Sequence, residues 1–204
     1  MRHMKLDVVF AGVGGQGIIT ASDILCEAAL LEGFDVAKAE THGMAQRGGS
    51  IVVHVRIGDE VSSPLIESGT GDVLIGFEVL EAVRALPLLK EGGTAIVNNK
   101  FIPPLSVLQG LAESPTKNEL MDTIKRKAKH VYEIDGIGLA EKAGNVLVMS
   151  TVFLGAFLSI PENPLKEEFV VEVLSQRVKA SYLDVNLKAL QVGKGSLFRN
   201  RKIR

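Results

Sequence analysis

The sequence contains a single cysteine, Cys26, among its 204 residues. One thiol excludes an internal disulfide and fits a reducing cytoplasm. It also excludes an iron–sulfur cluster held by this chain alone, because such clusters typically need four thiolates. Any iron–sulfur chemistry would therefore need a partner chain that carries the metal.

Excess charge of one sign and long apolar runs are missing as well. Lys and Arg number 23 against 24 Asp and Glu, for a formal net charge of -1, so nothing global points to nucleic acid or an anionic membrane surface. No stretch approaches the roughly 18 apolar residues of a membrane span, and residues 1–7 lack the apolar segment of a signal peptide. We expect a cytoplasmic protein with no nucleic-acid or membrane partner.

The pattern of apolar residues alternates between strands and helices along the chain. Buried or half-buried strands are expected at 5–11, 34–40, 51–57, 61–66, 72–78, 92–99 and 130–135, with 51–57 and 61–66 paired as a hairpin. Helices are expected at 17–31, at 80–90 with an interruption near Pro87, from a capping box at Thr116 and Glu119, and at 145–158, 165–178 and 181–192. Alternation of this kind predicts one α/β domain with a mostly parallel, doubly wound sheet and a helical extension at its C-terminal end.

The turn after the first strand, "AGVGGQGI", has the spacing of a Rossmann-like dinucleotide-binding motif. Gly12, Gly14 and Gly17 match G-x-G-x-x-G between a strand and a helix, which is the context the motif requires. Glycines there admit backbone angles closed to other residues, and the helix start presents free N–H groups to an anion. Glu40, at the end of the second strand, could accept the ribose hydroxyls of NAD(P); otherwise the glycines only form a tight turn.

A second polar loop, "ETHGMAQRGGS", follows the second strand. It gathers Glu40, His42, Gln46 and Arg47 between glycines at the expected carboxyl edge of the sheet, where ligands and partner surfaces meet. The two loops give the candidate site, with no catalytic and no metal-binding residue assigned: Gly12, Gly14, Gly15, Gln16, Gly17, Glu40, His42, Gln46 and Arg47.

Several other residues have structural explanations. Cys26 lies on the apolar face of the first helix and is expected to be an inert core residue. His54, inside a strand, is expected to be a structural histidine, and Glu78 a helix-start acid. The segment 145–158 is apolar on nearly every side, so it predicts either burial in the chain's own core or a partner or self-dimer interface.

The order of these segments resembles one family. "AGVGGQGIITASDIL", "ETHGMAQRGGSIVVHVRIG", "SPLI", "DVLIGFEVLEAVRALPLLKEGG" and the "LGA" at 154–156 follow one another as in the gamma-type subunits of 2-oxoacid:ferredoxin oxidoreductases, and the indolepyruvate branch is the most similar. We therefore divide the chain into a gamma-type domain at 1–193 and a basic, flexible tail at 194–204.

The resemblance implies a function for an assembly of which this chain is one part. A 2-oxo acid is decarboxylated to an acyl-coenzyme A, and the electrons pass to ferredoxin. The complex would use thiamine diphosphate, Mg2+, 4Fe-4S clusters and coenzyme A, held by a larger alpha subunit and not by this chain alone. The isolated chain would be inactive and could form a homodimer. A stand-alone NAD(P)-binding protein and a non-enzymatic dimeric interaction module are the alternatives.

One pattern imitates a thiamine site. Gly71-Asp72-Val73 precedes Asn98-Asn99 at about the right distance, but Val73 replaces the third glycine and Asp72 leads into a strand instead of leaving one. We predict no metal site there.

For the two glycine-containing loops, contact with the partner is favoured, and capture of a coenzyme A phosphate by Arg47, with His42 or Gln46, is the alternative.

Overall fold

The computed structural model describes residues 4–43 and 49–200 and, within α8, the side chains as far as Leu197. Six strands form one sheet in the order β2-β3-β1-β4-β5-β6. Their bounds are β1 Lys5–Val13, β2 Asp35–His42, β3 Ser50–Gly58, β4 Gly71–Gly76, β5 Leu89–Asn98 and β6 His130–Ile134. β3 is antiparallel to both of its neighbours, and the remaining pairs are parallel. The predicted doubly wound, mostly parallel α/β fold is confirmed.

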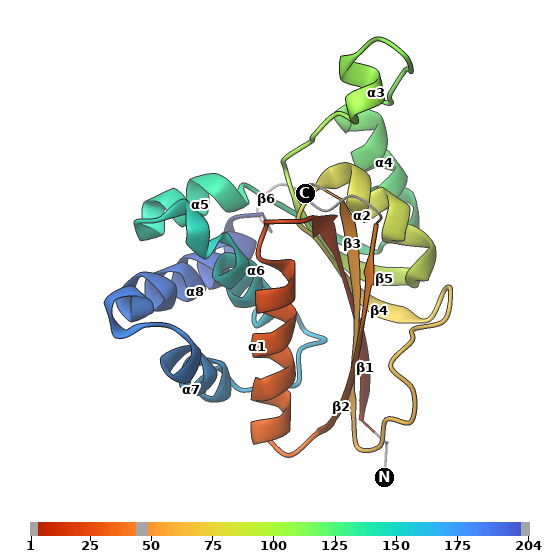
Figure 1. Ribbon diagram of the computed structural model, residues 1–204. Coiled ribbons are helices and arrows are strands. Elements are labelled where there is room, and N and C mark those ends of the chain that lie inside the picture. Colours follow the sequence, from red (N-terminus) through yellow and green to blue (C-terminus); the bar gives the residue numbers. More distant parts are fainter. Residues whose placement is uncertain (1–3, 44–48, 201–204) are drawn as a thin grey trace.

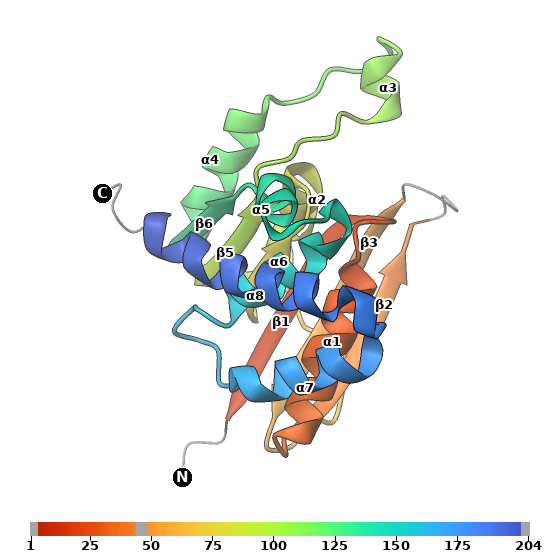
Figure 2. The same ribbon diagram turned by 90° about the vertical axis from the view of Figure 1, so that its left-hand side faces the viewer.

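Helices cover both faces of this sheet (Figure 1). One face carries α1 Ile18–Leu31, α5 Gly136–Ala143, α6 Met149–Phe157, α7 Glu167–Arg177 and α8 Ala180–Asn200, with a 3-10 turn at Val146–Val148 before α6. The other carries α2 Val79–Ala85 and α4 Lys117–Lys127, whose predicted capping box at Thr116 is present. The short helix α3, Leu105–Leu108, projects away from these layers (Figure 2).

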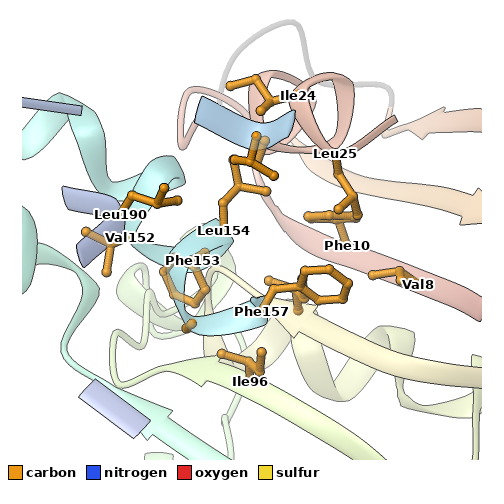
Figure 3. Packing of buried hydrophobic residues seen from close by; sticks show 14 of the residues in the cluster. Val8, Phe10, Ile24, Leu25, Ile96, Val152, Phe153, Leu154, Phe157 and Leu190 are labelled. Atoms are coloured by element: carbon orange, nitrogen blue, oxygen red, sulfur yellow. The ribbon is translucent and has the colours of Figure 1, made fainter. Parts of the chain in front are cut away.

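Alternation along the central strand β1 divides the apolar core in two. Val8 and Phe10 face the layer of α1 and α6, whereas Val9 and Ala11 face α2 and α4. Figure 3 shows Phe10 beside Phe157 in the larger of these cores. The sheet is thus buried on both faces, as its continuous apolar strands predict.

The apolar segment 145–158 is buried inside this chain. Every residue of α6 is buried, and α8, α1 and the sheet surround the helix. Phe153 stacks on Phe77 at the end of β4, with ring centroids 4.5 Å apart. The chain's own core therefore accounts for α6, although Leu147 just before it remains 81% exposed.

The predicted hairpin of 51–57 with 61–66 is wrong. β3 is already paired with β1 on one side and β2 on the other, so it has no free edge for a further strand. Residues 61–66 instead form a loop that covers one face of β3. In this loop the Ile66 N–H donates to His54 Nδ1 at 3.2 Å, and Ser63 offers its carbonyl to Arg56.

Two element boundaries also differ from the sequence-based expectation. The helix expected at 80–90 ends at Ala85, a 3-10 turn contains Pro87, and β5 begins at Leu89. The last helix passes through residue 193 to Asn200, so 194–200 are helical, with Leu197 buried. Residues 201–204 of the predicted tail lie outside the described part. None of the helices in the described part is both long and apolar enough to cross a bilayer.

Candidate functional site

The glycine turn lies at the carboxyl edge of β1 and opens α1. Gly15 and Gly17 have φ of 98° and 80°, a region that L side chains rarely adopt, and Gly17 is the N-cap of the helix. A Cβ on Gly12 would lie 2.8 Å from Phe77 Cβ and 2.6 Å from Gln16 Oε1. The motif is therefore needed for a tight strand-to-helix turn, whatever else it does.

Gln16 closes the turn from inside. Its Oε1 accepts from the Val13 N–H at 2.8 Å, and its Nε2 lies 3.4 Å from the Phe77 carbonyl. The Gly14 N–H donates to the Gly49 carbonyl, and the Gln16 N–H to that of Val13. Three backbone donors of the turn are thus used within the chain. The N–H groups in the first turn of α1 remain as the main donors that could bind an anion.

A shallow cleft of about 290 Å³ lies at this position. It is lined by Gly15, Gly17, Ile18, Ile19, Thr20 and Ile51. Pockets for drug-sized ligands run from roughly 300 to 1,000 Å³. The cleft is therefore at the lower limit for a small ligand and is too small to bury a whole dinucleotide.

Glu40 does not meet the glycine turn as an NAD site requires. β3 lies between β1 and β2, so the end of β2 is two strand spacings, or about 10 Å, from β1. Glu40 instead pairs with Lys38 Nζ at 2.6 Å and His42 Nε2 at 3.0 Å. The Lys38 hydrogen bond, followed by that from His42, lowers the pKa of Glu40. These contacts favour a surface ion-pair role and disfavour the NAD alternative. Gln46 and Arg47 lie outside the described residues.

Asn98 joins three strand ends at this edge, which sequence reasoning did not find. Its Nδ2 donates to the Phe77 carbonyl at 3.0 Å, and its Oδ1 accepts from the Gly136 N–H at 3.1 Å. Phe77 O is also the acceptor that Gln16 faces, so the turn after β1 is connected through β4 and β5 to the start of α5. The one available signal was an amide at the end of an apolar strand.

Two buried acids, Glu78 and Glu81, follow Phe77, whose carbonyl Asn98 binds. Glu78, as predicted, begins α2 and accepts from the N–H groups of Glu81 and Ile102. Glu81 accepts from Ser50 Oγ and pairs with Arg84 Nη1 at 2.6 Å. Each carboxylate is thus occupied by donors from its own chain, and neither is presented as a free acid or base.

The fold separates Asp72 and Asn98, the residues that imitate a thiamine site in the sequence. Asp72 starts β4, where it accepts from the Asp7 N–H and pairs with Lys90, whereas Asn98 ends β5. Because the strands are parallel, the two side chains lie at opposite edges, roughly 13 Å or more apart along the strands. Magnesium ligands must lie within about 2.1 Å of the ion. Residues 4–43 and 49–200 contain no group of three or more His, Cys, Asp and Glu residues that could hold a metal. Asp72 and Asn98 therefore do not fit a shared magnesium ion, and a single buried thiol does not fit an iron–sulfur cluster.

Cys26 is buried, as predicted, and its thiol should be unreactive in the folded protein. Burial raises its pKa from 9.0 to about 12, with only a smaller opposing effect from Lys38. Because the thiolate is the reactive form, an aromatic disulfide reagent at pH 8 should label the native chain slowly and the urea-unfolded chain rapidly. Stoichiometric labelling of native protein within minutes would contradict this.

His54 is buried, as expected of a structural histidine, and should make stability depend on pH. Burial lowers its pKa below the ordinary 6.5, and its Nδ1 must stay unprotonated to accept from Ile66. The unfolded chain takes up a proton near pH 6.5 while the native chain does not. The contribution of neutral His54 to the free energy of unfolding is therefore complete above that pH and decreases as the pH falls. Between pH 7.5 and 5.5, the free energy of urea unfolding should decrease less for His54→Gln than for wild type. An unchanged pH dependence in His54→Gln would refute the assignment.

The fold and the site together define a doubly wound α/β protein. Its carboxyl edge holds a glycine turn, and its described residues provide no cluster for a metal. Residues 7–195 match the family model described as pyruvate ferredoxin/flavodoxin oxidoreductase. The chain belongs to this family, and within it to the small subunits of 2-oxoacid:ferredoxin oxidoreductases.

Relatives of two kinds cover nearly the whole chain. A protein of Archaeoglobus fulgidus named indolepyruvate oxidoreductase subunit IorB is 42% identical over 190 residues, which are 93% of this chain and 94% of that protein. The pyruvate/ketoisovalerate oxidoreductases common subunit gamma of Thermococcus litoralis is 28% identical over 86% of this chain and 93% of its own length. Both names describe subunits of oxidoreductases.

Solved structures share the fold. The gamma subunit of a keto/oxoacid ferredoxin oxidoreductase from Geobacter sulfurreducens superposes with a TM-score of 0.72 at 23% identity and covers 96% of this chain and 98% of its own. The 2-oxoglutarate:ferredoxin oxidoreductase of Magnetococcus marinus gives 0.71 at 23% identity, and the match spans 31% of that longer chain. The same fold thus occurs both as a separate chain and as part of a longer one.

Proposed function

We propose that this chain is the accessory subunit of an indolepyruvate:ferredoxin oxidoreductase. In the complex a 2-oxo acid is decarboxylated oxidatively to an acyl-coenzyme A, and electrons pass to ferredoxin. A larger subunit holds thiamine diphosphate, Mg2+ and the iron–sulfur clusters. This chain contributes a structured surface at the carboxyl edge of its sheet.

One observation carries the indolepyruvate assignment. Identity to the Archaeoglobus protein named for indolepyruvate oxidoreductase is 42% over 93% of the chain, against 28% to the pyruvate/ketoisovalerate gamma subunit of Thermococcus litoralis. The single, buried thiol supports the division of labour, since this chain cannot supply the ligands of a cluster.

The glycine turn faces the larger subunit in this proposal. Three of its backbone donors are already used within the chain, and the adjoining cleft is shallow, which suits close packing better than deep ligand burial. Contact with coenzyme A is the second candidate, because the Magnetococcus structure is described with coenzyme A bound. Arg47 in the second glycine-containing loop tests this candidate. In the whole complex, Arg47→Ala should leave the KM for coenzyme A unchanged if that loop only contacts the partner. A raised KM with intact assembly would instead support phosphate capture.

The substrate assignment is tested on the complex of this chain with its larger subunit. Ferredoxin reduction is measured under anaerobic conditions with indolepyruvate, pyruvate and 2-ketoisovalerate at equal concentrations. We expect the highest kcat/KM with indolepyruvate. A preference for pyruvate or 2-ketoisovalerate would refute the indolepyruvate assignment while keeping the chain in its family.

A further inference from the structure

We propose that the arm at residues 101–116, which carries α3, is a leucine anchor that inserts into an apolar groove of the larger subunit. This inference rests on the proposed function, since it names the surface through which the accessory subunit is held. The arm leaves the carboxyl end of β5 and returns to α4, and Figures 1 and 2 both show it standing clear of the body.

Three leucines of the arm are among the most exposed large apolar side chains of the described residues. Leu105, Leu108 and Leu111 are 67%, 69% and 77% exposed. Leu105 and Leu108 are three residues apart on α3, the spacing with which a helix presents anchors to a groove, and Leu111 follows directly after Gly110. Isolated exposed leucines are common, but three on one projecting turn form a local apolar surface of the kind that marks an interaction site.

The arm is a closed turn and not a loose loop. The Leu111 N–H donates to the Ser106 carbonyl at 2.8 Å, and the Gly110 N–H to the Val107 carbonyl at 3.0 Å. With Gly110 at φ 70°, this is the Schellman arrangement that ends helices. Because the backbone is already ordered, little conformational entropy would be lost when the leucines become buried.

The chemistry of the arm indicates the occupant. Glu113 is the single charged residue between Phe101 and Thr116 in a chain that is 23% charged, so an apolar partner surface suits it and an acidic or basic one does not. Two arms of identical chains meeting each other would bury three leucines a side, far less than the roughly 800 Å² per partner of a stable interface. A larger partner that also covers the glycine turn, at the same edge of the sheet, can supply the remaining area.

The test measures binding of the purified larger subunit to the immobilised chain. Leu105→Ser combined with Leu108→Ser should raise the dissociation constant roughly tenfold or more, as expected when anchor side chains are lost. The matched control is Leu30→Ser with Leu31→Ser at the far end of α1, where the leucines are 54% and 46% exposed, and it should bind like wild type. Gly110→Ala is a third variant. Its added Cβ meets nothing within 4 Å, so it acts only by straining the turn and should weaken binding several-fold.

Each outcome decides something different. If the arm variants are folded by circular dichroism and bind like wild type, the anchor is refuted and the proposed function stands. If wild-type chain does not bind the larger subunit at all, the proposed function fails first. If wild type is a dimer in solution that the arm variants convert to a monomer with unchanged affinity for the larger subunit, the arm is a self-association surface and the proposal is overturned.

Discussion

Replacing Gly193 by alanine should lower the free energy of unfolding by about 3 kcal/mol, the upper range for overpacking a core. A Cβ on Gly193 would lie 2.1 Å from the Val152 carbonyl oxygen, and one on Gly155 would lie 2.1 Å from that of Leu190. The two glycines therefore allow α6 and α8 to pack backbone against backbone, and Figure 3 shows Val152 beside Leu190 at this contact. A peptide carbonyl cannot rotate out of the way as a side chain can, so the helices must separate.

Gly195 provides the control two residues along the same helix. A Cβ there meets nothing within 4 Å, and α8 continues past it. Gly195→Ala should therefore stabilise the chain by roughly 0.5 to 1 kcal/mol through helix propensity. Urea unfolding followed by circular dichroism gives both values. Equal stabilities for Gly193→Ala and Gly195→Ala would contradict the packing of α8 on α6.

Asn98→Ala should cost about 3 kcal/mol of stability. The substitution leaves the buried Gly136 N–H without its acceptor and removes the shorter of two hydrogen bonds to the Phe77 carbonyl, and an unsatisfied buried group costs roughly 1 to 3 kcal/mol. Asn99→Ala, next along the chain and only partly buried, should change stability by less than about 0.5 kcal/mol. Both values come from urea unfolding.

The same pair tests whether this asparagine binds metal. Thiamine diphosphate with Mg2+ should leave the unfolding midpoint of the wild-type chain unchanged, because Asp72 and Asn98 lie at opposite sheet edges. A rise in the midpoint with the cofactors that disappears in Asn98→Ala would show that the amide ligates the ion after all.

Local patterns predicted most of the fold because their causes are local. The strand before Gly12, the turn itself and the capping box at Thr116 each depend on residues that are neighbours in sequence, and all three are present. The position of β3 depends on long-range pairing. A sequence that reads strand, loop, strand does not tell whether β3 will pair with β2, with β1 or with 61–66, and here it pairs with the first two.

The candidate site was predicted less completely for the same reason. The glycines could be placed at the correct edge from the order of elements alone. The role of Asn98 depends on Gly136, which is 38 residues away, and on the backbone of Phe77, so no local pattern could predict it. The leucines of the arm form no recognisable sequence motif, and only their exposure in the structure makes them informative.

The apolar α6 shows a further limit. A helix that is apolar all round must be covered, but its sequence does not say by what. In the structure α8 is the cover, and the glycines that admit it are 38 residues apart in sequence, at 155 and 193. Within the described residues, the chain therefore covers α6 itself.

The central claim is that this chain shapes a partner's redox enzyme without holding a redox centre itself. The most direct measurement separates the complex into its two subunits and determines iron, thiamine diphosphate and ferredoxin reduction in each fraction and after recombination. We predict that iron and thiamine remain with the larger subunit, that this chain alone contains neither and has no turnover, and that recombination restores activity. Iron bound to this chain, or ferredoxin reduction by it alone, would contradict the claim.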